Sequence, residues 1–143
     1  MDIGFAWYFL SLKGRISRRE FWLGQGLLMV VLPLFAVRLA AYFIAVRQPA
    51  NYDEMAFALA LPFYLISAAM FWPVNAIVVK RLHDLNLSGW WVAVSLALSY
   101  VSSVINNCSL TFLFMTAVML AGVPQGTPGW NRFGADPLAL QTA

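Results

Sequence analysis

The chain has 143 residues, of which 62% are hydrophobic and only 10% are charged. Ordinary soluble domains are roughly 45–50% apolar and about 25% charged, so this composition argues against a soluble globular protein. The formal net charge of +3 does not indicate nucleic-acid binding, because the nine basic residues flank apolar runs instead of forming one surface. The single cysteine, Cys108, cannot form an intrachain disulfide. The composition therefore predicts one helical membrane domain.

Residues 1–20 are predicted to lie along the membrane surface. The run Ile3–Leu12 is too short to cross a bilayer and is rich in aromatic residues, which is typical of an interfacial helix. It does not fit a secretory signal, because the positive charges follow the apolar run instead of preceding it. Ser17 and Glu20 have the spacing of a capping box, which predicts that a helix starts at this point.

The apolar stretch 21–46 is predicted to contain the first membrane helix. Arg19 and Arg38 would be about 29 Å apart along a helix, close to the roughly 30 Å thickness of the hydrocarbon core. Arg38 is therefore expected to reach the far interface with its long side chain, although a charge at this place can also act within the membrane. Residues 39–46 are expected to bend along the outer surface before the chain breaks at residues 47–51.

The second membrane helix is predicted over residues 54–79. It contains Pro62 and Pro73, and Asn75 follows shortly after the second proline. A kinked helix with a lone amide can line a solute pathway or pair with a neighbouring helix, and the sequence leaves both readings open.

The stretch Val79–Trp91 combines charged residues with a turn and two tryptophans, between two long apolar runs. It is expected to be a short loop that follows one membrane helix, with the basic residues Lys80 and Arg81 anchoring the end of that helix at the membrane surface. The next helix is expected to re-enter behind Trp90 and Trp91, since tryptophan is enriched at membrane interfaces.

Residues 90–105 and 110–123 are predicted to form a hairpin of two short membrane helices, hinged at Asn106 and Asn107. One continuous helix over both runs would be about 51 Å long, which is too long for an ordinary bilayer. The Pro- and Gly-rich residues 124–143 are predicted to form a cytoplasmic tail that is frayed at its end.

The distribution of basic residues predicts the orientation in the membrane. Seven of them fall on one face of this arrangement: Lys13, Arg15, Arg18, Arg19, Lys80, Arg81 and Arg132. The other face has Arg47 and, at its interface, Arg38. The positive-inside rule then places both termini and the loop Lys80–Ser88 in the cytoplasm. The sequence thus predicts an all-α membrane protein with four transmembrane helices, an amino-terminal interfacial helix and both termini cytoplasmic.

The segments richest in charged, aromatic and turn residues fall on this one face and are expected to meet there. We call the expected set the cytoplasmic cluster, and its members are Arg15, Arg18, Arg19, Glu20, Trp22, Lys80, Arg81, His83, Asp84, Trp90, Trp91, Asn131, Arg132 and Asp136. Its cations are expected to share Glu20, Asp84 and Asp136 in half-buried ion pairs at the helix ends, and such pairs are costly to break.

With these residues laid out, the sequence resembles the bacterial "domain of unknown function 805" family of small inner-membrane proteins. The motifs that carry the resemblance are Gly14–Trp22, then Lys80–Asp84 with Ser88–Trp91, and finally Pro128–Gly129 with Asn131–Gly134 and Asp136–Pro137. The family typically has glycine where this chain has Asn86, and asparagine also tolerates a left-handed backbone. The resemblance implies a four-helix inner-membrane protein and no established activity.

No catalytic, cofactor or metal site is predicted. His83 and Asp84 are adjacent, and neighbouring side chains on a helix do not face each other. Ser88 lacks the nucleophile-elbow and oxyanion-hole signatures of a hydrolase. One histidine and one cysteine are too few for a metal site, and the glycines of the tail lack the spacing of a phosphate-binding loop.

Two functions remain open. The first is a non-catalytic scaffold or regulator whose cytoplasmic cluster binds anionic lipid headgroups or a protein partner. The alternative is a small transporter or channel, expected to be a homo-oligomer because four short helices enclose little space. Its support is the polar and helix-breaking content of the spans, namely Arg38, Pro62, Pro73, Asn75, Ser95, Ser99, Ser102 and Ser103.

Overall fold

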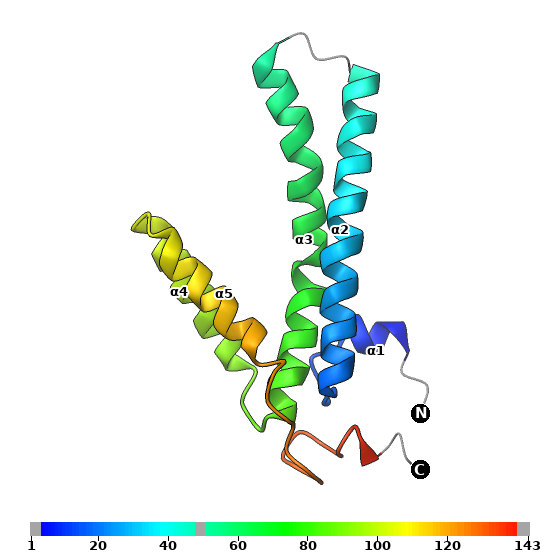
Figure 1. Ribbon diagram of the computed structural model, residues 1–143, viewed down its shortest axis with the longest axis vertical. Coiled ribbons are helices and arrows are strands. Elements are labelled where there is room, and N and C mark those ends of the chain that lie inside the picture. Colours follow the sequence, from blue (N-terminus) through cyan, green and yellow to red (C-terminus); the bar gives the residue numbers. More distant parts are fainter. Residues whose placement is uncertain (1–3, 48–50, 140–143) are drawn as a thin grey trace.

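The computed structural model describes residues 4–47 and 51–139, and within them the chain is all-helical apart from turns and one isolated bridge. The helices are α1 (Phe5–Leu10), α2 (Arg18–Arg47), α3 (Tyr52–Asp84), α4 (Trp90–Val104) and α5 (Cys108–Leu120). Figure 1 shows α2 and α3 as a long antiparallel pair, with α1 lying across one end. The shorter α4–α5 hairpin inclines away from the pair, and the segment after α5 folds beneath the same end that carries α1.

Helices α2 and α3 are long and apolar enough to cross a membrane, and α4 is a shorter apolar helix. At the ordinary helical rise, the 30 residues of α2 and the 33 residues of α3 extend about 45 and 50 Å. Only 17% and 11% of their most apolar stretches are buried. Such exposure does not fit the core helices of a soluble protein, since apolar surface on that scale is unfavourable in water.

The start of α2 follows the predicted capping box. The backbone N–H of Ser17 donates to the Glu20 carboxylate at 2.7 Å, and the N–H of Glu20 donates to the Ser17 hydroxyl at 3.3 Å. These reciprocal bonds satisfy two donors that the first turn of a helix leaves unpaired, so the helix begins here as predicted.

The expected bend over residues 39–46 is wrong, because α2 continues without a break to Arg47. The buried positions along this part of the helix are Ala36 and Ala40, and those on the facing part of α3 are Ala58 and Pro62. Small side chains allow two helices to approach closely, which keeps the end of α2 packed on α3 instead of turning away.

The loop expected at Val79–Trp91 is also wrong in its extent, because α3 remains helical through Asp84. The connection between α3 and α4 is confined to residues 85–89. It begins where the Leu87 N–H donates to the Leu82 carbonyl at 2.8 Å, with Asn86 in the left-handed region at a φ of 59°. The backbone closes the helix in this way without needing glycine, so the charged residues before it belong to the last turn of α3.

The second hairpin turns at Asn106 and Asn107, where the sequence places the hinge. Asn106 has a φ of 54°, and the Asn107 side chain accepts the N–H of Leu110 at 3.2 Å, which caps α5. Helix α4 packs closely on α5 but touches α3 only slightly. The hairpin is therefore a loosely attached unit beside the main pair.

The packed core lies at one end of the α2–α3 pair. Its buried apolar side chains include Ile16, Phe21, Ile77 and Leu82, with Val92 and Ala121 from the α4–α5 side. Residues from α1 pack against its edge. Residues 124–139, expected as part of a tail, fold against this end, while residues 140–143, expected to be frayed, lie outside the described residues.

Candidate functional site

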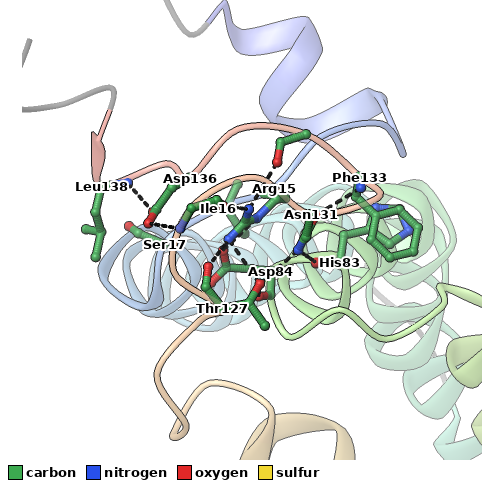
Figure 2. Close-up of polar contacts among 12 residues, drawn as sticks. Arg15, Ile16, Ser17, His83, Asp84, Thr127, Asn131, Phe133, Asp136 and Leu138 are labelled. Carbon is green, nitrogen blue, oxygen red and sulfur yellow. Dashed lines mark hydrogen bonds and ion pairs between the residues drawn. The ribbon is translucent and has the colours of Figure 1, made fainter.

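The side chain of Asp84 forms the centre of a buried charged cluster at the packed end of the molecule. Asp84 is the last residue of α3 and is only 2% exposed. Arg15, from the segment before α2, bonds one carboxylate oxygen through Nε at 3.1 Å and through a terminal nitrogen at 3.0 Å (Figure 2). Arg81, one turn earlier on α3, bonds the other oxygen. We call these three residues the charged hub.

The hub has two guanidinium groups for one carboxylate, so the remaining donors of both arginines need other acceptors. Arg15 donates to the carbonyls of Thr127, Gly129 and Gly134, the last two at 2.7 and 3.0 Å. A buried cation is tolerated only when its donors are satisfied, and charge-assisted bonds are the strong ones. Arg15 therefore fixes the path of the chain after α5.

Arg81 binds the first part of the same chain segment. Its Nε donates to the carbonyl of Ala121 at 3.0 Å, and one terminal nitrogen donates to the carbonyl of Pro124. A longer bond of 3.5 Å reaches the carbonyl of Ile16, next to Arg15. The two arginines thus hold residues 121–134, which we call the clasped segment, from opposite ends.

The clasped segment in turn caps the carboxyl end of α3. The Thr127 N–H and hydroxyl both donate to the main-chain carbonyl of Asp84, at 2.8 and 2.9 Å. Asn131 donates to the main-chain carbonyl of His83 and to the Thr127 hydroxyl, both at 2.9 Å. The last carbonyls of a helix have no partner within the helix, so these bonds satisfy groups that burial would otherwise leave unpaired.

Gly126 passes against the Asp84 carboxylate. A Cβ at this position would lie 1.9 Å from one carboxylate oxygen, so only glycine leaves room for the hub. The sequence does not reveal the roles of Gly126 and Thr127. The signal available was their position beside the Pro128–Gly129 motif, but a turn-rich composition alone does not show what a turn packs against.

Lys80 forms a second buried anchor, and its expected pairing with a carboxylate is not what the structure shows. Its ammonium donates to the carbonyls of Trp7 and Tyr8 in α1 and lies 4.5 Å from the centre of the Trp7 ring. Carbonyls near a helix carboxyl end have partial negative charge, and an aromatic face also attracts a cation. Lys80 therefore attaches α1 to α3.

The other acidic members of the cytoplasmic cluster serve mainly backbone groups. Glu20 caps α2, and Asp136 accepts the N–H of Leu138 at 2.9 Å and of Gly129 at 3.0 Å. The N–H of Leu138, the N–H of Gly129 and the nearby Arg15 guanidinium hold the pKa of Asp136 below its ordinary value. Asp136 thus stays ionised and stabilises the turns of the chain after α5 instead of pairing directly with an exposed cation.

Of the remaining basic and aromatic members, several lie on the surface around the hub. Arg18 is exposed and donates to the carbonyl of Val123 at 3.4 Å, and Arg19 is exposed as well. The indole N–H of Trp22 donates to the carbonyl of Gly122 at 3.0 Å. The side chains of Trp90 and Trp91 are 78% and 58% exposed. The structure therefore surrounds the buried hub with exposed basic and tryptophan residues. We call these residues the exposed rim, and its members are Lys13, Arg18, Arg19, Trp22, Trp90, Trp91, Trp130 and Arg132.

His83 does not form a pair with the Asp84 carboxylate, which is occupied by the two arginines. Its ring stacks on Phe133 with centroids 3.9 Å apart, and its Nδ1 lies 3.1 Å from the carbonyl of Gly14. Arg132 covers the same Phe133 ring at 4.7 Å and donates to the carbonyl of Asn86 at 2.8 Å. These contacts fasten the clasped segment to the α3–α4 turn.

The two expected intramembrane polar residues lie apart from the hub. Arg38 is exposed on the second half of α2, nine residues before the end of the helix at Arg47. The Asn75 side chain donates to the carbonyl of Phe71, one turn earlier in its own helix, at 2.6 Å. The hydroxyls of Ser95 and Ser99 likewise donate to carbonyls of α4 at 2.8 Å. Across residues 4–47 and 51–139, no group of three or more metal-ligating side chains comes together.

The family model described as "Protein of unknown function (DUF805)" matches residues 9–135, which include every residue of the hub and the clasped segment. The chain belongs to the DUF805 family. The resemblance seen in the sequence motifs is thereby confirmed.

Three relatives from Escherichia coli (strain K12) align with most of this DUF805 protein. It is 30% identical over 139 residues to the inner membrane protein YhaI, with 92% of this chain and 94% of the relative covered. It is 28% identical over 142 residues to the uncharacterized protein YiiR, with 91% and 87% covered. It is 23% identical over 129 residues to the inner membrane protein YhaH, with 90% and 88% covered. No solved structure gives a significant match.

Replacing the hub carboxylate is expected to destabilise the DUF805 protein strongly. Asp84→Ala leaves two buried arginines without their counter-charge, which typically costs about 3–5 kcal/mol. Asp53→Ala is the matched control, because Asp53 is an exposed aspartate in the first turn of the same helix. Thermal unfolding in detergent should show a much lower midpoint for Asp84→Ala only. Equal midpoints for the two variants would contradict the structural role of the hub.

A methyl group at residue 126 is expected to displace the clasped segment. Gly126→Ala places a Cβ inside the Asp84 carboxylate, whereas Gly26→Ala adds a methyl group with nothing within 4 Å. Hydrogen–deuterium exchange of residues 121–134 should accelerate in Gly126→Ala and stay unchanged in Gly26→Ala. Unchanged exchange in both variants would show that the segment is not held by this contact.

Proposed function

We propose that this DUF805 protein is an inner-membrane protein with four membrane-crossing helices and with the charged hub on the cytoplasmic side. Support comes from the two long, exposed apolar helices and from the relatives YhaI and YhaH, which are named inner membrane proteins. Helices α4 and α5 are about 22 and 20 Å long, less than the roughly 30 Å hydrocarbon core. Their crossing therefore requires a locally thinned bilayer, which membranes accommodate at modest cost.

The charges at the packed end of the molecule support this orientation. The basic residues of the amino-terminal segment, of the last turn of α3 and of the clasped segment gather there, together with α1. Basic segments flanking membrane helices are retained on the cytoplasmic side. The α4–α5 hairpin returns the chain to the end from which it left, so the clasped segment lies on that same side.

We further propose that the protein is a non-catalytic scaffold or regulator whose exposed rim binds anionic lipid headgroups. The observation that carries this proposal is the separation of buried and exposed cations. Arg15, Lys80 and Arg81 are buried and committed to internal partners, so they are not available to a ligand. The cations of the exposed rim are Lys13, Arg18, Arg19 and Arg132, and its tryptophans are Trp22, Trp90, Trp91 and Trp130.

A rim of this composition suits the headgroup region. Each basic side chain near an anionic membrane surface contributes about 1 kcal/mol, and tryptophan prefers the same depth. The buried hub makes the rim a fixed surface, because it joins the segment before α2, the end of α3 and the clasped segment. Fixed charges lose less conformational freedom on binding than charges on a mobile tail.

A transporter or channel has weaker support. The amide of Asn75 and the hydroxyls of Ser95, Ser99 and Ser102 all bond backbone carbonyls of their own hairpin or helix. A cavity of about 340 Å³ between α3 and the α4–α5 hairpin is lined by apolar side chains with one serine. Such a lining does not offer the ordered polar contacts that a solute pathway uses.

The membrane arrangement is testable by cysteine labelling in a Cys108→Ser background. In intact cells, an impermeant maleimide should modify Tyr52→Cys and Ile105→Cys, since both exposed positions lie at the far ends of helices from the hub. Gln125→Cys, exposed in the clasped segment, should react only after the inner membrane is permeabilised. Reaction of Gln125→Cys in intact cells would show that the orientation is opposite to the proposed one. Protection of Ile105→Cys alone would show that α4 and α5 do not cross the membrane, which leaves two crossings.

Headgroup binding is testable by native mass spectrometry of the purified protein with mixed phosphatidylglycerol and phosphatidylcholine. The double variant Lys13→Gln with Arg19→Gln should lose about tenfold or more of its preference for phosphatidylglycerol, since two rim charges contribute about 2 kcal/mol. Arg38→Gln is the matched control, because it removes an exposed cation of α2 away from the rim. A wild-type protein without preference for phosphatidylglycerol would overturn lipid binding in favour of a protein partner.

A further inference from the structure

A cavity of about 350 Å³ lies beside the exposed rim, outside the charged hub. Its walls are Leu12, Val79, His83, Ser88, Gly89 and Trp90, so it lies between the segment after α1, the last turns of α3 and the first turn of α4. Volumes of this size are typical of small-molecule sites. Most of the lining is apolar. The polar side-chain groups among these walls are mainly the imidazole of His83 and the hydroxyl of Ser88.

The imidazole of His83 is held in one orientation and one tautomer. Its Nδ1 lies 3.1 Å from the carbonyl oxygen of Gly14, and a carbonyl only accepts hydrogen bonds. Nδ1 therefore has the proton, and in the neutral ring Nε2 has a lone pair. The stack on Phe133, with centroids 3.9 Å apart and planes 8° from parallel, fixes the ring.

The Nε2 atom is directed toward the cavity. A Cβ at Gly89, one of the lining residues, would lie 3.4 Å from Nε2 and 2.8 Å from a methyl carbon of Val79. Glycine at this position keeps the space in front of Nε2 open, although its φ of −60° suits any residue. Among residues 4–47 and 51–139, the hydrogen bond of the imidazole is made by Nδ1 and its aromatic stack by the ring face, and neither interaction uses Nε2.

Two further groups complete the chemistry of the cavity. The Ser88 oxygen accepts the Trp90 N–H at 3.4 Å, which leaves the hydroxyl proton to donate. The Trp90 side chain lines the cavity and is 78% exposed, so its indole face is open to a cation. The cavity thus combines a hydrogen-bond acceptor, a hydrogen-bond donor and an aromatic face.

We propose that this cavity binds the ethanolamine headgroup of phosphatidylethanolamine. The ammonium N–H donates to Nε2 of His83 and lies against the Trp90 indole, while a phosphate oxygen accepts from the Ser88 hydroxyl. An ionised phosphate oxygen cannot form a hydrogen bond with Nε2, because both atoms are acceptors. A quaternary choline ammonium has no N–H to donate. The assignment rests on the proposed function, which places this end of α3 at the depth of the lipid headgroups.

The single histidine of the chain allows a direct test by nitrogen NMR of the imidazole. The protein, labelled with ¹⁵N-histidine, is placed in phosphatidylcholine nanodiscs at about pH 8, where an ordinary imidazole is neutral. Replacing half of the lipid with phosphatidylethanolamine should move the Nε2 resonance upfield, because the lone pair of Nε2 then accepts a hydrogen bond. The Nδ1 resonance should not move. An Nε2 resonance that is the same in both lipids overturns the proposal.

Two additional samples identify the source of the ligand. Phosphatidylglycerol in place of phosphatidylethanolamine should leave Nε2 unchanged, and a shift of equal size would reassign the cavity to headgroup hydroxyls. Phosphoethanolamine dissolved at the same concentration should also have no effect, because it lacks the membrane anchor that concentrates the headgroup at the cavity. An equal shift with this soluble compound would overturn a lipid as the ligand.

A matched pair of variants distinguishes a failed headgroup site from a failed membrane assignment. His83→Asn retains a donor for the Gly14 carbonyl and removes Nε2, so the preference for phosphatidylethanolamine over phosphatidylcholine in native mass spectrometry should disappear. Arg38→Gln should retain that preference, because Arg38 is neither a wall of the cavity nor a member of the exposed rim. If His83→Asn retains the preference while Gln125→Cys still labels only from the inside, this inference fails and the proposed orientation stands.

Discussion

The pairing of one buried carboxylate with two buried arginines is the interaction on which the packed end of this protein depends. Isolated charges are expensive to bury, and the cost is offset only when each donor and acceptor finds a partner. Asp84 supplies the counter-charge, and the backbone carbonyls of the clasped segment supply the remaining acceptors. The hub therefore requires the clasped segment, because most of the remaining donors of both arginines are satisfied by its carbonyls.

This arrangement divides the molecule into regions of unequal packing. At the hub end, apolar residues such as Phe21 and Ile77 are fully buried beneath the charged groups. Along the rest of α2 and α3 the side chains are mostly exposed, and the α4–α5 hairpin touches α3 only slightly. The hairpin is therefore packed less tightly on the rest of the molecule than the segments at the hub end are. The cavity beside His83 lies at the junction of these two regions.

The difference between buried and exposed cations changes how the basic residues are interpreted. In the sequence they form one series, and each is equally suited to bind a lipid headgroup. In the structure Arg15, Lys80 and Arg81 hold the chain together, and the residues that remain accessible lie around them. The family motifs contain residues of both kinds. In this chain, the motif Gly14–Trp22 therefore combines a position that maintains the fold, Arg15, with positions that face the surroundings, Arg18 and Arg19.

The sequence by itself determined the helical membrane character, the capping box at Ser17 and Glu20, the turn at Asn106 and the gathering of charged segments at one end. These features depend on local chemistry: long apolar runs, side chains that cap neighbouring backbone groups, and residues that tolerate a left-handed backbone.

Only the tertiary structure decided that α3 extends through Asp84, that Lys80 binds carbonyls of α1, and that Gly126 and Thr127 enclose the hub. The acceptors in these contacts are mostly backbone carbonyls, which every residue has. Which carbonyl a buried cation reaches depends on the path of distant segments, and a pattern of side chains along the sequence does not record that path.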